Sequence, residues 1–104
     1  MITLIVQVDV KQGMMDKAQE LIREILSNMP ENEPGTLEYD AFTVTGEGNE
    51  SKIFFYEKYQ HEEAYRIHHE NLAKRMSELE TVIDFSTMQV KRCIQFAGHR
   101  INQK

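Results

Sequence analysis

Two side chains that can exchange protons, Glu57 and His68, lie in apolar surroundings near the middle of the sequence. Glu57 belongs to Ile53–Tyr59, a run of aromatic and β-branched residues that predicts a strand, and alternation places it on one face with Phe55. His68 falls on the apolar stripe of the helix expected next. A carboxylate and an imidazole that face one interior can act as a general acid–base pair, because burial raises the pKa of the carboxyl group.

Both residues also have an interpretation without chemistry. His68 could be a core histidine whose ring is satisfied by a backbone carbonyl or by Glu57. Glu57 could be a hydrogen-bonding anchor for His68 or Tyr39, because an unpaired buried carboxylate is costly. The two side chains meet only if helices cover the Glu57 face of the strand; otherwise Glu57 points into an interface between subunits.

Aromatic and aliphatic residues on the same faces complete a candidate binding pocket. Tyr39 and Tyr59 can donate phenolic hydrogen bonds to a substrate oxygen, or they can simply fill space. Phe55, beside Glu57, and Leu72, on the His68 stripe, are the apolar substrate-binding residues that we expect.

A metal site is not expected from the neighbouring histidines. His61 and His69 are close to His68 in sequence, but they point elsewhere on a helical wheel, whereas metal ligands must converge from one face. The single cysteine, Cys93, cannot form an internal disulfide, and a reducing cytoplasm is the simplest compartment. A reactive thiol is the lesser interpretation of Cys93, because no base stands beside it in the sequence.

The periodicity of apolar residues predicts four strands and two helices. The strands are Ile2–Val10, Thr36–Thr45, Ile53–Tyr59 and Val82–Phe96, and the helices are Met14–Asn28 and His61 to about Glu80. The polar cluster Pro30–Gly35 is expected to end the first helix, and the glycine-bearing loop 45–51 to close a hairpin. In the last strand, the expected core residues are Phe85, Met88, Val90 and Ile94. The order β-α-β-β-α-β is that of an α+β, ferredoxin-like antiparallel sheet.

Apolar residues on both faces of the middle strands predict self-association. Two helices cover only one face of the sheet, and Phe42 and Phe54 would leave the other face too apolar for water. A homodimer whose sheets pack face to face is the economical solution.

Length and composition favour one small domain that binds neither nucleic acid nor membrane. The 104 residues fit a single domain over 1–104, with 97–104 as a loose or partner-contacting tail. The formal net charge of −5 argues against phosphate backbones, which require clustered Lys and Arg. No run of apolar residues approaches the length of a transmembrane helix.

Three short motifs, in this order and spacing, resemble the antibiotic biosynthesis monooxygenase family of dimeric α/β-barrel proteins. They are EPGTLEY at 33–39, FYEKY at 55–59 and EAYRIH at 63–68, and the resemblance covers residues 2–95. It implies a cofactor-independent monooxygenase acting on a small aromatic or quinol-like molecule, with His68 and Glu57 as catalytic residues. The alternatives are an isomerase of a small phosphorylated carbonyl, similar to enzymes that process autoinducer-2 phosphate, or a non-catalytic small-molecule binder.

The sequence departs from the family pattern at several positions. Tyr59 stands where a Trp is usual, and Asn71, Leu72 and Lys74 occupy the region where many members carry a second His. The residues that degrade haem in related proteins are not matched at Val6, His68 and 76–78. Since no glycine loop precedes a helix either, we expect no bound flavin, haem or metal.

Overall fold

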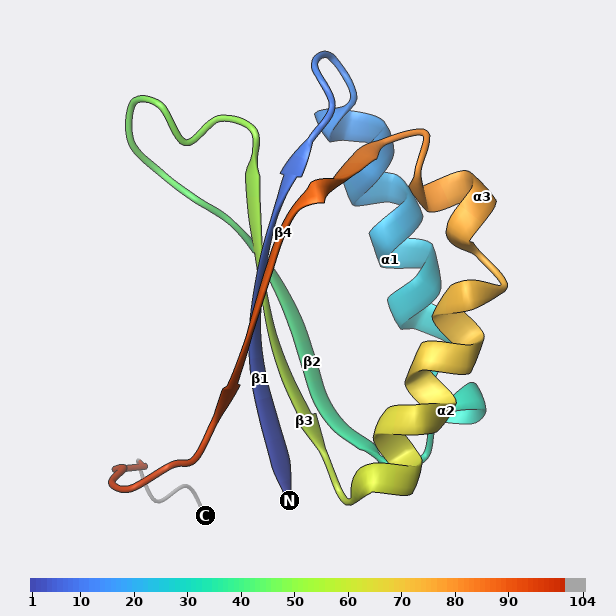
Figure 1. Cartoon of the computed structure of the whole chain (residues 1–104), viewed down its shortest axis with the longest axis vertical. Coiled ribbons are helices and arrows are strands. Elements are labelled where there is room, and N and C mark those ends of the chain that lie inside the picture. Colours follow the sequence, from blue (N-terminus) through green and yellow to red (C-terminus); the bar gives the residue numbers. More distant parts are fainter. Residues whose placement is uncertain (101–104) are drawn as a thin grey trace.

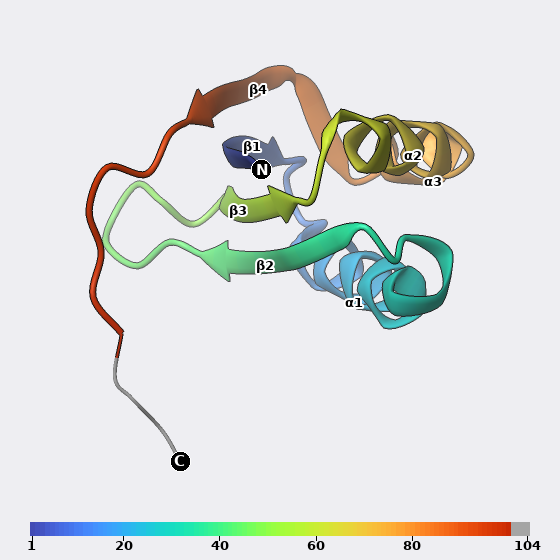
Figure 2. The same cartoon turned by 90° about the horizontal axis from the view of Figure 1, so that it is seen from below.

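Four strands and three helices form the predicted α+β, ferredoxin-like layout in the computed structural model, which describes residues 1–100. The elements are β1 Ile2–Val10, α1 Met15–Asn32, β2 Thr36–Thr43, β3 Lys52–Tyr59, α2 Glu62–Ala73, α3 Met76–Leu79 and β4 Ile83–Cys93. The strands pair antiparallel in the order β2-β3-β1-β4. All three helices lie on one side of this sheet (Figure 1), with α1 in one row and α2 and α3 in the other (Figure 2). Helix α1 contacts β2, and α2 contacts β2 and β3.

Strict alternation on the two central strands decides which side chains face the helices. In β1 and β3 every second residue is buried, from Ile2 to Val10 and from Ile53 to Tyr59. The register pairs Leu4 with Glu57, so both point from the sheet toward the helices. We call this helix-packed side the covered face and the other side the open face. Glu57 therefore lies on the covered face, which the sequence left undecided.

Helix α1 extends beyond the end predicted from the sequence. It passes through Pro30 and ends at Asn32, whereas we expected the polar cluster to stop it after Asn28. Met29 is buried in this last stretch, and its carbonyl accepts the backbone N–H of Glu33 at 2.7 Å. Pro30 has no amide hydrogen and so cannot donate a hydrogen bond within the helix. Burial of Met29 and this capping bond offset that loss. The extra turn carries Glu33 inward to the core.

The second predicted helix is two helices. Helix α2 ends at Ala73, and the Arg75 N–H closes a tight turn on the Leu72 carbonyl at 3.0 Å. The Arg75 guanidinium then donates to Glu78 at 2.6 Å and to Glu24 of α1 at 3.2 Å. Downstream of this bend Leu79 is buried in the core. The sequence did not indicate the bend, because the apolar stripe continues with helical spacing through both helices.

Strand β4 is shorter than predicted, and three of its four expected core residues are exposed. Cys93 pairs with Thr3, at the start of β1, so the strand has no neighbour to bond beyond this point. Ile94 is 93% exposed, Val90 51% and Met88 38%, so the prediction that these three residues pack in the core is wrong. Only Phe85 of the four packs against the core. Residues 97–100 of the predicted tail are exposed, and 101–104 lie outside the described residues.

The open face of the sheet carries apolar side chains with no helix over them. Phe42 is 52% exposed and pairs with Phe54, and Ile5 pairs with Tyr56 on the same face. Within residues 1–100, no helix combines the length and the apolar character needed to cross a membrane.

Candidate functional site

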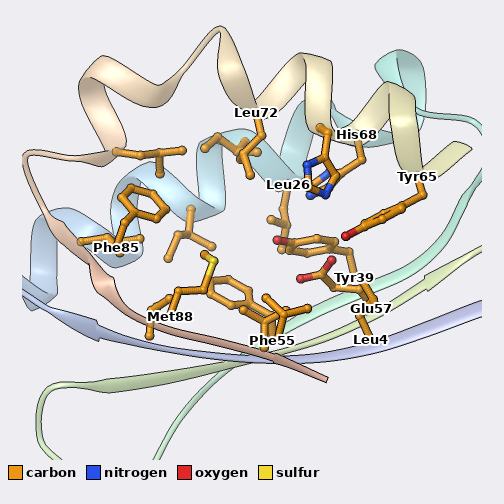
Figure 3. Close-up of a pocket in the computed structure, with 18 residues that line it drawn as sticks. Leu4, Leu26, Tyr39, Phe55, Glu57, Tyr65, His68, Leu72, Phe85 and Met88 are labelled. Carbon is orange, nitrogen blue, oxygen red and sulfur yellow. The ribbon is translucent and has the colours of Figure 1, made fainter. Parts of the chain in front are cut away.

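A small cavity of about 110 Å³ lies between the covered face and the helices. In Figure 3, His68, Tyr65 and Leu72 project from α2 toward the sheet, while Tyr39 and Glu57 rise to meet them. Aliphatic and aromatic side chains line the rest, including Leu26 of α1 and, at the far end, Phe85 and Met88 of β4. The cavity thus has one polar end and one apolar end. Its volume is below the roughly 300–1,000 Å³ of sites for drug-sized ligands, which favours a small occupant.

His68 at the polar end is bonded to a buried carboxylate that sequence reasoning did not identify. Its Nδ1 lies 3.0 Å from Oε1 of Glu33, and the two residues are 3% and 5% exposed. The same Oε1 accepts the Thr36 hydroxyl at 2.9 Å, and Oε2 accepts the Asn71 amide at 3.5 Å. Because Glu33 occupies Nδ1, Nε2 is the ring nitrogen left to act on a ligand.

The turn between α1 and β2 places Glu33 against α2. A Cβ added at Gly35 would lie 2.6 Å from Cβ of Ala64, so only glycine allows the turn to approach the first turn of α2 this closely. Ala64 precedes His68 by one helical turn, which brings the imidazole to the level of Glu33. The His61 ring caps the same helix by accepting the Ala64 N–H at 3.1 Å. Besides Tyr39, the motif 33–39 therefore supplies Glu33, the partner of His68, and Gly35, which allows the close approach.

Glu57 is held by a tyrosine hydroxyl and not by His68. The Tyr59 hydroxyl donates to its Oε1 at 2.6 Å, and both residues are buried. The His68 ring also packs against Tyr39 and Tyr59, with ring centroids 5.1 and 5.4 Å apart. Of the two partners that the sequence suggested for His68, Glu57 and a backbone carbonyl, neither takes Nδ1, because Glu33 does.

The two carboxylates on either side of His68 have opposite pKa shifts. Burial alone would raise the pKa of Glu33, but hydrogen bonds and charge from His68, with help from Thr36 and Asn71, hold it below its ordinary 4.5. For Glu57 burial prevails and raises the pKa, although the Tyr59 hydroxyl and the nearby imidazole counter it in part. One carboxylate is thus kept ionised, and the other is shifted toward its protonated form.

Most of the sequence-predicted site residues meet in this cavity. Glu57, His68, Tyr39, Phe55 and Leu72 all line it. Tyr59 does not line it: its side chain is fully buried, and it supports the site through its hydrogen bond to Glu57. The roles assigned to these residues remain predictions.

Two residues of the site were not identified from the sequence. The helical wheel directed His69 away from His68, but His69 also lines the cavity, and its ring packs edge-on against Tyr65 with centroids 4.4 Å apart. Glu33 begins the first of the three family motifs, but its position in a polar turn cluster gave no sign that it would contact His68. In the described part of the chain, no three His, Cys, Asp or Glu side chains converge as metal ligands would.

Comparison with known proteins relates this chain to one protein family. Residues 1–75 match the sequence model of the antibiotic biosynthesis monooxygenase family. No curated protein matches the sequence.

Solved structures share the fold across nearly the whole chain. A candidate antibiotic biosynthesis monooxygenase of Bacteroides thetaiotaomicron superposes with a TM-score of 0.77 at 14% identity, covering 97% of this chain and 95% of that one. An antibiotic biosynthesis monooxygenase gives 0.73 at 22% identity, covering 93% and 100%. A further candidate, from Caulobacter crescentus, gives 0.75 at 14% identity, covering 88% and 86%. The sequence match extends over most of the chain, from β1 through α2, and the chain therefore belongs to the antibiotic biosynthesis monooxygenase family.

Proposed function

We propose that the protein is a cofactor-independent monooxygenase that acts on a small hydroquinone-like aromatic molecule in the covered-face cavity. The observation that carries this proposal is a buried His68, backed by an ionised carboxylate, at the polar end of an otherwise apolar cavity. Such a site can remove a phenolic proton while excluding bulk water. Family membership supports the same class of reaction.

The proposed reaction needs a base, a dry pocket and O₂. Nε2 of His68 takes the phenolic proton, and the electron-rich anion passes an electron to O₂. One oxygen atom then adds to the ring, and the other leaves as water, so that a hydroquinone and O₂ give a hydroxyquinone and H₂O. The apolar walls formed by Phe55, Leu72 and Phe85 would keep water from the reactive pair.

The charge of the cavity bears on the runner-up function, isomerisation of a phosphorylated carbonyl. Phosphate groups are usually held by Lys, Arg or clustered backbone N–H groups. Among the described residues that line the cavity there is no Lys or Arg. This lining favours a neutral aromatic substrate over a phosphorylated one.

We also propose that the working unit is a homodimer formed by open faces packed together. Phe42, Phe54, Tyr56 and Ile5 supply an apolar centre for such contact. Charged pairs surround it, with Lys58 beside Glu38 and Lys52 beside Asp9 in the register. This distribution resembles the apolar core and polar rim of protein interfaces.

The proposed activity can be tested by measuring oxygen uptake with menadiol, the hydroquinone prepared by chemical reduction of menadione. We expect protein-dependent consumption of O₂ above the rate of spontaneous oxidation, and one labelled oxygen in the product when ¹⁸O₂ is supplied. Turnover without O₂ would favour isomerase chemistry on another substrate. Saturable binding with no acceleration of O₂ uptake would leave a non-catalytic binder.

A further inference from the structure

His68 separates two spaces of different character. On one side it lines the apolar cavity, and on the other it lines a groove of about 300 Å³ between α1 and α2. Glu33 lines the groove but not the cavity, and the groove is otherwise marked by Asn28, Asn71 and Lys74. A carboxylate in this position cannot touch a ligand in the cavity, so any effect it has on chemistry must pass through the imidazole.

The hydrogen bonds to Glu33 determine which of its partners carries the proton. An ionised carboxylate only accepts hydrogen bonds, so the shared proton of the 3.0 Å contact resides on Nδ1 of His68. Thr36 and Asn71 donate to the same carboxylate and fix its orientation. The neutral ring then carries its lone pair on Nε2, the nitrogen available to the cavity.

We propose that Glu33 is a positioning residue: it holds His68 in the Nδ1–H tautomer, so that Nε2 faces the cavity as the base. This inference rests on the proposed function for its catalytic consequence. In the reaction, the substrate proton moves to Nε2 and the charge of the resulting imidazolium is balanced by Glu33. The proton then returns from Nε2 to the oxygen that leaves as water, so the dyad ends each cycle unchanged.

The alternative role for Glu33 is structural, as the residue that ends α1 and fastens it to α2. A purely structural role would make stability fall and leave the ring tautomer unchanged. The two roles are separable because the tautomer is visible in the resting protein. Glu57, on the other side of the ring, is engaged by the Tyr59 hydroxyl and does not compete for Nδ1.

Nitrogen NMR of ¹⁵N-histidine-labelled protein, combined with turnover measurements, tests the proposal. In the wild type, His68 should show a protonated Nδ1 and an unprotonated Nε2 at neutral pH. Glu33→Gln, which keeps the shape of the side chain, should lose this preference. It should also lower kcat by about 10-fold or more, with the ~10²–10⁴-fold that a general base contributes as the upper limit. Glu31→Gln, an exposed position on the same helix, is the matched control and should change neither readout.

A second variant and the wild type itself keep the test decisive. Glu33→Asp retains a carboxylate and should recover part of the Nδ1–H population and of the turnover that Glu33→Gln loses. An Nε2–H tautomer in the wild type, or an unchanged tautomer in a folded Glu33→Gln, would overturn the positioning role. If the wild type consumes no O₂, the proposed function fails, and the tautomers of the wild type and Glu33→Gln still show whether Glu33 orients the ring.

Discussion

The two faces of the sheet carry similar residues in different settings. Phe55 and Phe54 are adjacent in β3, yet Phe55 is buried under the helices on the covered face, while Phe54 lies on the open face beside the half-exposed Phe42. The helices that pack over the covered face enclose a cavity beside it, and burial and hydrogen bonding there shift the pKa values of nearby carboxyl groups. The lack of a helix turns the other face into a surface suited to a second copy. What packs over a strand, more than its own composition, decides the role of its residues.

The largest effect is expected at the polar end of the cavity. His68→Ala should lower turnover by roughly 10²–10⁴-fold because it removes the proposed base, while the protein stays folded. Steady-state O₂ uptake and thermal melting measure the two effects, with His99→Ala in the exposed tail as the matched control. If turnover survives and only thermal stability falls, His68 is a core residue and not a catalytic one.

Removing a large side chain from the covered face should cost stability. Phe55→Ala deletes a ring that is 8% exposed, and changes of this kind lower the free energy of unfolding by about 3–5 kcal/mol. Urea denaturation measures the loss, and sedimentation should show the association state unchanged. A loss below about 1 kcal/mol would mean that the helices cover this face only loosely.

The open face should respond through assembly. Phe54→Asp places a charge at the centre of the proposed dimer interface, so monomers or aggregates should replace dimers. Phe54→Leu, which keeps the position apolar, should still dimerise. Sedimentation velocity at micromolar concentration distinguishes these outcomes, and a wild type that is a stable monomer there would refute the dimer.

The smallest expected effects come from pH and differ in sign between two carboxylates of the covered side. Glu57 has a raised pKa, so the folded state holds its proton more tightly, and the free energy of unfolding should fall as pH rises above 4.5. Glu33 has a lowered pKa, so its contribution is complete above 4.5 and is lost on acidification. Urea titrations of Glu57→Gln and Glu33→Gln at several pH values should therefore diverge from the wild type in opposite pH ranges. Parallel curves would contradict the assigned shifts.

Much of the covered face was predictable from periodicity. Alternation in β3 grouped Phe55, Glu57 and Tyr59, and helical spacing placed His68 on an inward stripe, because both patterns follow from backbone geometry. The sequence could not say which face of β3 the helices cover. That choice depends on how α1 and α2 pack together on one side of the sheet, which no single strand records.

The partner of His68 was beyond sequence reasoning for a physical reason. Glu33 is 35 residues away in the chain, and it reaches the ring only because α1 continues through Pro30 and Gly35 approaches Ala64 closely. Both are tertiary effects that override local signals, since proline and a polar cluster normally end a helix. The early end of β4 has a similar origin: it is set by where β1 begins.

A crystal structure with menadiol, the test substrate, bound in the absence of O₂ would show most directly whether the covered-face cavity is the substrate site. We predict that its ring lies between Phe55 and Leu72, with one phenolic hydroxyl donating a hydrogen bond to Nε2 of His68. Glu33 should remain on Nδ1 in that complex. Menadiol bound on the open face or in the groove, with the cavity still empty, would contradict the assignment.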